Sequence, residues 1–251
     1  MRRLKLTVQY DGTDFAGFQR QPDAVTVQQV LEECIGEALG HEVRVLAAGR
    51  TDAGVHAIGQ VVALDTDAAI PVEAVPVAFT SKLPDSVAVV AAEEVQPSFH
   101  PRFDARSKRY VYRIVSRPVR SPFLGRYAWC VRHSLTAEMM AAAAGHIQGR
   151  HDFRSFCAAG SDVETFERQV TRVEVARDGD LVEVWIDADG FLYQMVRIIV
   201  GTLVEVGRDR MAPETVAQII EARDRTKAGP TAPPQGLCLV RVEYERPRTE
   251  D

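Results

Sequence analysis

The sequence predicts an α+β fold of two related α/β units with mainly antiparallel sheets. Stretches typical of strands and helices follow one another in a similar order in both halves of the 251-residue chain. The strand-like stretches are short and alternate apolar with polar residues, as strands exposed on one face do. One strand–turn–strand pattern centres on Asp178 and Gly179, a turn sequence typical of antiparallel hairpins. We expect an N-terminal α+β domain over 1–105 and a C-terminal one over 106–251.

The first half reads as strand, helix, strand, loop and strand. Leu4, Leu6 and Val8 share one face of the first strand. The helix predicted over 26–40 has apolar residues at helical spacing, a threonine that can cap its start and a glycine that can end it. A strand, a loop interrupted by glycines and another strand are predicted over 42–66.

The second half repeats this order loosely. Its predicted elements are a strand over 107–118, an alanine-rich helix over 135–153, the hairpin over 171–190, helices over 191–207 and 212–225, and a closing strand from Leu237. Short antiparallel strands beside helices fit this order better than a doubly wound parallel sheet.

The net charge of −5 hides a strongly basic segment. Residues 102–132 carry nine basic residues and one acid, so the segment is +8 and the remainder about −13. The nine are Arg102, Arg106, Lys108, Arg109, Arg113, Arg117, Arg120, Arg126 and Arg132. A basic stripe on an acidic body can bind phosphate groups. The alternative is a solvated basic surface.

The cysteines and the lengths of the apolar runs indicate the cellular compartment of the protein. The four cysteines are far apart in the sequence and form no CxxC pair, which argues against zinc and gives no disulfide framework. No apolar run is long enough for a signal peptide or a membrane helix. We therefore expect a cytoplasmic protein without a membrane partner.

The loop GRTDAGVHA, residues 49–57, is the strongest candidate for chemistry. A carboxylate held between glycines, as Asp52 is, can act as a nucleophile or a general base. Asp52 and His56 have no evident third ligand, so we expect no metal. The glycine spacing matches neither a P-loop nor a dinucleotide fingerprint. From the residues alone, an aspartate that merely forms a turn is the favoured interpretation, and the motif becomes specific only through the resemblance given below.

Several further blocks occur in a fixed order along nearly the whole chain. They are YDGTDFAGFQRQ, TVQQVLEECIGEAL, GRTDAGVHAIGQVV, FHPRFDARSKRYVYRI, HDFRSF, GFLYQMVRIIVGTLVEVG and PPQGLCLVRVEY. In these blocks the chain resembles the TruA family of bacterial tRNA pseudouridine synthases. The resemblance implies ferredoxin-like or RRM-like halves flanking a central RNA-binding cleft. It also implies a homodimer that converts uridine to pseudouridine at positions 38, 39 and 40 of the tRNA anticodon stem-loop, without a cofactor.

The resemblance also implies roles for single residues. Asp52 matches the essential catalytic aspartate, and Arg50 matches an arginine that fills the gap left by the flipped nucleotide. Tyr110 matches the tyrosine that stacks on the target base. Arg197 matches the basic residue that pairs with the aspartate.

The residues themselves add to these roles. Arg197 lies in an apolar run, where arginine is seldom buried without a partner; the alternative is that it reaches solvent at a helix edge. Arg109 and Arg113 share the strand face opposite to Tyr110, and we expect both to contact RNA.

Two residues depart from the family pattern, and two other functions remain as alternatives. Phe18 stands where the family usually has tryptophan, and Gln194 where it usually has asparagine. A catalytically inert RNA-binding protein could use the basic segment and the aromatic residues alone. A glycosidase is the weaker alternative, because such enzymes usually need two positioned carboxylates.

Overall fold

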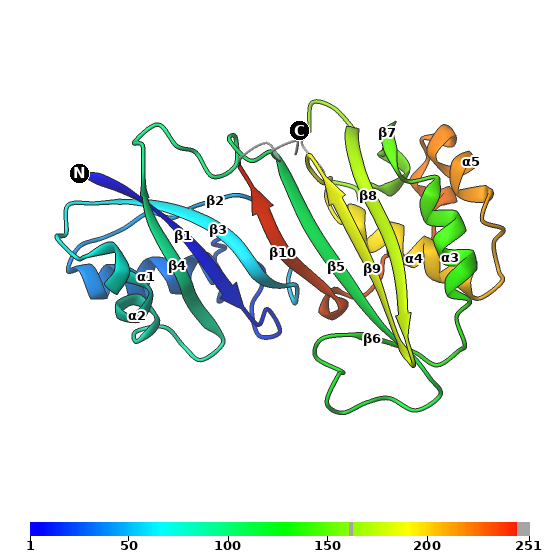
Figure 1. Ribbon diagram of the computed structural model, residues 1–251, viewed down its shortest axis with the longest axis horizontal. Helices are drawn as coiled ribbons and strands as arrows, with labels where there is room; N and C mark the ends of the chain where they lie inside the picture. Colours follow the sequence, from blue (N-terminus) through cyan, green and yellow to red (C-terminus); the bar gives the residue numbers. More distant parts are fainter. Residues whose placement is uncertain (161–162, 245–251) are drawn as a thin grey trace, which may run out of the picture. The chain divides into compact units, whose positions relative to one another are not determined.

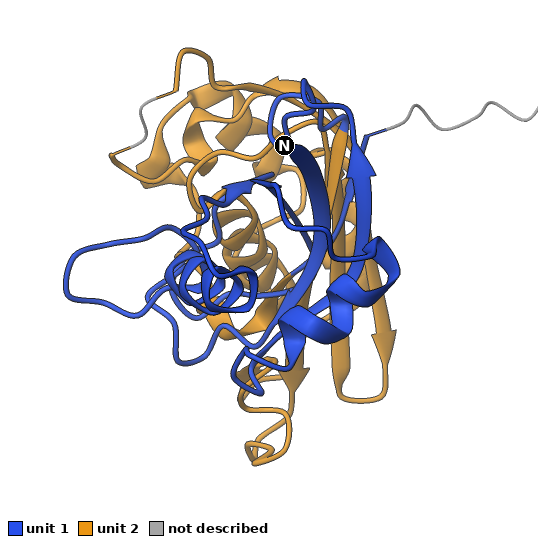
Figure 2. Ribbon diagram, turned by 90° about the vertical axis from the view of Figure 1, so that its left-hand side faces the viewer, with its two compact units in different colours: residues 1–106, 239–251 blue, residues 107–238 orange. Residues whose placement is uncertain are grey.

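The computed structural model describes residues 1–160 and 163–244. These residues form two compact units (Figure 2): Met1–Arg106 with the described residues from Leu239 on, and Ser107–Cys238. Each unit combines helices with a mainly antiparallel set of strands, which confirms the predicted α+β class. The proposed domains over 1–105 and 106–251 stay a prediction, although the last strand groups with the first unit rather than the second.

The sheet of the first unit has the strand order β4-β1-β3-β10, with β2 beside β3 (Figure 1). The strands are β1 Arg2–Tyr10, β2 Leu46–Ala47, β3 His56–Thr66, β4 Val87–Val95 and β10 Leu237–Glu243. Strand β1 lies antiparallel to both β3 and β4. Leu4, Leu6 and Val8 are buried, as their alternation predicted, and carry one face of β1 into the core.

Helix α1 (Val27–Leu39) has the predicted ends. The Thr26 side chain accepts a hydrogen bond from the Gln29 N–H group, and Gly40 adopts a left-handed conformation with φ of 74°. The helix buries one apolar stripe, which is formed by Val27, Leu31 and Ile35. A second, shorter helix, α2 (Val75–Thr80), follows a 3₁₀ turn over Val72–Ala74.

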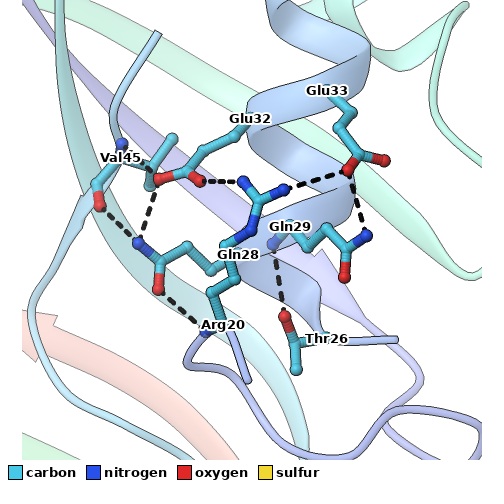
Figure 3. Close-up of polar contacts among 7 residues, drawn as sticks. All are labelled: Arg20, Thr26, Gln28, Gln29, Glu32, Glu33 and Val45. Carbon is cyan, nitrogen blue, oxygen red and sulfur yellow. Dashed lines mark hydrogen bonds and ion pairs between the residues drawn. The ribbon is translucent and has the colours of Figure 1, made fainter. Parts of the chain in front are cut away.

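Polar side chains tie α1 to the segments on either side of it (Figure 3). Arg20 forms ion pairs with Glu32 and Glu33, with N–O distances of 3.1 and 3.3 Å. Glu32 also accepts the backbone N–H of Val45 at 3.1 Å, and Gln28 accepts the backbone N–H of Arg20 at 3.1 Å. The helix thereby holds the segment before it and the segment that leads to the Asp52 loop.

The strands of the second unit have the order β5-β9-β8-β7. They are β5 Ser107–Ser116, β7 Gly149–Asp152, β8 Glu167–Asp178 and β9 Leu181–Ala188, and β6 Trp129–Val131 runs parallel to β5. Strands β8 and β9 form the predicted hairpin, in which Asp178 lies opposite Leu181. Gly179 has a φ of 55°, which the tight turn requires.

Three helices complete the second unit: α3 Ala137–Gly145, α4 Met195–Gly207 and α5 Thr215–Ala222. Helix α4 is almost wholly buried, and α3 packs against it and against β8. Short 3₁₀ turns lie at Arg154–Phe156, Arg225–Lys227 and Pro234–Gly236. None of the described helices is long and apolar enough to cross a membrane.

Three predicted helices are shorter than expected, and one of them, predicted over 212–225, spans only Thr215–Ala222. The helix predicted over 135–153 ends at Gly145, because residues 149–152 pair with β8 as strand β7 instead. Gly149 has a φ of 126°, which no helix accommodates. The helix predicted over 191–207 begins only at Met195.

Candidate active site

Asp52 lies on a tight turn between β2 and β3. The N–H group of Val55 donates to the carbonyl oxygen of Asp52 at 3.1 Å, and Gly54 has a φ of 76°. This is the geometry of a turn that needs glycine at its third position. Asp52 is half-buried, whereas Arg50 is exposed and Thr51 is buried. The loop thus presents a carboxylate and a guanidinium group beside a residue that is anchored inside the unit.

The backbone of residues 12–18 packs directly against this loop. Phe18 donates its N–H to the Thr51 carbonyl oxygen at 3.0 Å, and Gly54 donates to the Phe15 carbonyl oxygen at 3.3 Å. Gly17 has a φ of 97°, and a Cβ atom there would lie 2.9 Å from the Thr51 carbonyl oxygen. The lack of room for a side chain at Gly17 lets the two segments approach closely, so residues 12–18 support the Asp52 loop.

Buried polar side chains hold the loop from beneath. The hydroxyl groups of Tyr10 and Thr51 lie 2.8 Å apart, and the Gln60 amide donates to the Gly49 carbonyl oxygen at 2.9 Å. All three side chains are at most 7% exposed. The sequence reasoning missed Tyr10 and Gln60, which read as ordinary strand residues.

His56 connects two segments of this region. Its Nδ1 atom accepts the N–H of Gly12 at 3.0 Å and lies 3.2 Å from an Asp11 carboxylate oxygen. The ring is 5% exposed and joins the start of β3 to the end of β1.

Tyr110 lies in β5 of the second unit. Its ring is 7% exposed and packs edge-to-face with Phe191, with ring centroids 5.0 Å apart and an interplanar angle of 84°. Phe191 is half-buried and comes just before α4. The sequence reasoning did not identify Phe191 as the partner of Tyr110, because the two residues are far apart in the chain.

Arg197 lies in the first turn of α4, between the buried Val196 and Ile198. It is half-buried, and its Nε–H donates to the Ala232 carbonyl oxygen at 2.8 Å. The Ala232 N–H donates back to the Arg197 carbonyl oxygen at 3.0 Å. Burial raises the pKa of the Tyr112 phenol, and the nearby Arg197 charge opposes that rise. Arg197 is therefore oriented by the chain after α5 rather than extended into solvent.

Arg109 and Arg113 are held by acids directly opposite them on β9. Arg109 donates through Nε and Nη2 to both carboxylate oxygens of Asp187, at 2.8 and 2.7 Å. Arg113 donates through Nε to Glu183 at 2.9 Å. Each pair reduces the positive charge that its arginine presents.

The other basic residues of segment 102–132 differ in exposure. Five arginines are exposed: Arg102, Arg106, Arg120, Arg126 and Arg132. The loop between β5 and β6 also exposes Phe123, at 88%, and Tyr127, at 42%. Aromatic rings beside arginines are a common arrangement for contacting unpaired RNA bases. In the sequence, the only feature that marks these two rings is their position within the basic segment.

A sequence profile of the tRNA pseudouridine synthases matches residues 6–104 and 143–245. The chain belongs to the tRNA pseudouridine synthase family. The predicted isomerase class and the resemblance to this family are thereby confirmed. Asp52 and Arg197 lie within the two matched ranges, and Tyr110 lies between them.

Relatives within this family are similar over almost their whole length. The tRNA pseudouridine synthase A of Moorella thermoacetica is 52% identical over 243 residues, which cover 96% of this chain and 99% of the relative. That of Pelobacter propionicus is 47% identical over 244 residues, covering 97% and 100%. Among solved structures, a chain of a Cbf5–Nop10–Gar1 complex is 15% identical with a TM-score of 0.43. The match covers 94% of this chain and 48% of that one.

The two departures from the family pattern lie at structurally distinct places. Phe18 is 2% exposed, and its ring centroid lies 6.3 Å from that of Tyr10, beside the Asp52 loop. Gln194 has a φ of 57° immediately before α4. Asparagine adopts this left-handed conformation more readily than glutamine does.

Proposed function

We propose that this protein converts uridine to pseudouridine at positions 38, 39 and 40 of the tRNA anticodon stem-loop, with Asp52 as the catalytic carboxylate. The observation that carries the proposal is the Asp52 turn. In a chain of the tRNA pseudouridine synthase family, a half-buried carboxylate follows a buried, hydrogen-bonded threonine on a turn braced by residues 12–18. Such a carboxylate is both accessible and fixed in position, as a catalytic group must be.

The reaction rearranges one nucleoside without changing its composition. The C1′–N1 glycosidic bond breaks, the uracil turns, and a C1′–C5 bond forms. The proton on C5 is lost and N1 gains one, so nothing is oxidised or reduced and no cofactor is needed. An ionised Asp52 can serve as a nucleophile or as a base in this sequence.

The target nucleotide must leave the base stack before C1′ and C5 become accessible. Unstacking costs a few kcal/mol, which contacts to the flipped base and to phosphates offset. Arg50, exposed two residues before Asp52, is proposed to occupy the vacated space. Tyr110 is proposed to stack on the flipped base, and its edge-to-face contact with Phe191 would fix the orientation of the ring.

Arg197 is proposed to pair with Asp52 and favour its ionised form. A guanidinium group near a carboxylate stabilises the charged state of that carboxylate. The hydrogen bond from the Arg197 Nε–H to the Ala232 carbonyl oxygen orients the guanidinium group. Since Arg197 is half-buried among apolar residues, a carboxylate partner would also offset the cost of burying its charge.

Phosphate contacts are proposed for the basic segment 102–132. The exposed Arg120 and Arg126 lie in the loop between β5 and β6, which also exposes aromatic rings. Arg109 and Arg113 are proposed to add weaker contacts, since their ion pairs with β9 orient the side chains but also reduce their charge. A homodimer would bring two such segments to one tRNA, which suits recognition of RNA by shape. With tRNA as substrate, we place the protein in the cytoplasm.

Release of tritium from tRNA labelled at uridine C5 tests this proposal. Wild type is expected to release tritium, and Asp52→Ala and Asp52→Asn to release none above background. Asp23→Asn is the matched control, because Asp23 is an exposed loop aspartate with a φ of 57° that asparagine tolerates well. The control should match wild type.

Each other outcome points to a different function. Equal release by wild type and both Asp52 variants would remove Asp52 from the mechanism. Binding of tRNA with no release by wild type would favour an inert RNA-binding protein. Free uracil among the products would favour a glycosidase.

A further inference from the structure

We propose that Tyr10 and Gln60 are positioning residues for the reaction, acting through Thr51 on the Asp52 loop. This inference rests on the proposed role of Asp52 and deepens it. A buried chain of hydrogen bonds runs from the Gln60 amide to the Tyr10 hydroxyl and on to the Thr51 hydroxyl. The chain joins two neighbouring strands, β1 and β3, to the residue directly before Asp52.

The contacts hold the loop at two points before Asp52. Gln60 Nε2 donates to the Gly49 carbonyl oxygen at 2.9 Å and to the Tyr10 hydroxyl at 3.4 Å. The Tyr10 and Thr51 hydroxyl groups are 2.8 Å apart. Thr51 is also held through its carbonyl oxygen by the N–H of Phe18. The backbone that enters Asp52 is therefore fixed both by a side chain and by a main-chain group.

The chemistry of the Gln60 amide fixes the direction of one of these hydrogen bonds. The Gln60 NH₂ group can only donate, so the Tyr10 oxygen accepts from it. The Tyr10 and Thr51 hydroxyl groups share the next hydrogen bond, in which either can donate.

Burying polar side chains costs free energy, so buried polar groups in a core that apolar residues could fill suggest a role beyond packing. Gln60 is 0% exposed and Tyr10 is 4% exposed. Buried amides and hydroxyls require partners, and an apolar side chain would avoid the requirement. In β3 the next two residues, Val61 and Val62, are apolar, as expected of a buried strand. The polar side chain at position 60 instead donates a hydrogen bond to the Gly49 carbonyl oxygen of the Asp52 loop.

The expected effect is on turnover rather than on tRNA binding. Displacement of a catalytic group by about 1 Å can lower a rate by about 100-fold. Neither Tyr10 nor Gln60 is exposed to a ligand as large as tRNA. Removing the Tyr10 hydroxyl should therefore lower kcat about 10- to 100-fold and leave KM for tRNA within about twofold of wild type.

The experiment compares Tyr10→Phe, Thr51→Val and Thr51→Ser by steady-state tritium release and by thermal melting. Thr51→Ser keeps the hydroxyl and should retain most of kcat, whereas Thr51→Val keeps the shape and should lose it. The double variant Tyr10→Phe/Thr51→Val should be no slower than the slower single variant, because both changes break the same Tyr10–Thr51 hydrogen bond. Tyr244→Phe is the matched control: it removes a hydroxyl that donates to the Pro101 carbonyl oxygen at 2.8 Å, and kcat should not change.

A purely structural role predicts something different. Tyr10→Phe would then melt at a lower temperature while its folded fraction kept a kcat within twofold of wild type, and that result overturns the inference. Equal losses in Thr51→Ser and Thr51→Val overturn it as well, even if Tyr10→Phe fails to fold. Failure of the proposed function itself looks different again, since wild type would then release no tritium.

Discussion

The Asp52 loop and the basic segment 102–132 differ in how firmly the structure fixes their functional side chains. The loop is short, and its conformation is set by main-chain hydrogen bonds, by glycines with no room for a Cβ atom and by buried polar side chains. The basic segment runs along a strand and a long loop, and its charges are variously paired and exposed. One region presents a single carboxylate in one place, and the other spreads positive charge over a surface.

This difference shows which sequence features can be read as function. In a motif such as GRTDAGVHA each residue type fits one position in the packed loop, so single residues can be given roles. A count of charges gives no such roles, because strand register decides which arginines pair with acids. Arg109 and Arg113 lie opposite Asp187 and Glu183 in β9, and the net charge of +8 for the segment does not reveal those pairs.

The largest effect is expected from Gly17→Ala. The added Cβ atom would lie 2.9 Å from the Thr51 carbonyl oxygen, at a residue with a φ of 97°. The strain and the forced shift of the loop should cost about 2–4 kcal/mol of unfolding free energy. Turnover should fall by more than about 100-fold. Denaturant unfolding and tritium release measure the two effects.

Gly40→Ala separates backbone strain from the clash. Gly40 also has a positive φ, of 74°, but an added Cβ atom would meet nothing within 4 Å. This variant should lose only about 1 kcal/mol and keep the wild-type kcat. A Gly17→Ala protein with wild-type kcat would contradict the claim that loop geometry limits turnover.

Arg197→Ala should have the next largest effect. If Arg197 serves Asp52, kcat should fall by about 10²- to 10³-fold while KM for tRNA stays within about threefold. Arg208→Ala is the matched control. Arg208 lies directly after the last residue of α4, and its Nη1 atom lies 3.4 Å from Oε1 of Glu205. A loss of thermal stability with unchanged kcat would assign Arg197 a structural role only.

The smallest effect is expected from single arginines of the basic segment. Arg120→Ala should reduce the slope of log Kd against log salt concentration for tRNA by about 1, with unchanged stability. Arg113→Ala should reduce the slope less and lower stability slightly, because it leaves Glu183 without its ion-pair partner. Equal slopes for wild type and Arg120→Ala would remove this loop from the phosphate contacts.

Much of the fold follows from local patterns in the sequence. The alternation in β1, the capped helix α1 and the hairpin at Gly179 depend on residues that are neighbours in the chain. Strand β4 escaped prediction because the AAEE within it has little strand propensity, and its pairing with β1 decides its structure. The predicted alanine-rich helix is too long, because the pairing of β7 with β8 overrides helix propensity after Gly145.

Some residues of the candidate site could likewise be predicted from the sequence, and others could not. Asp52 could be proposed as catalytic from the family resemblance, whereas composition and spacing alone favoured a turn residue. The roles of Tyr10 and Gln60 could not, because a tyrosine and a glutamine in strands usually indicate packing or an exposed edge. Only the register of β1 against β3, which puts Val8 opposite Gln60, brings Tyr10 and Gln60 to the same loop.

The most direct test of the central claim is a map of pseudouridine in tRNA from a strain that lacks this protein. Wild-type protein supplied to that strain should restore pseudouridine at positions 38, 39 and 40, and Asp52→Asn should restore none. Intact modification at these positions in the deletion strain would contradict the proposed target. Full restoration by Asp52→Asn would contradict the proposed catalytic residue.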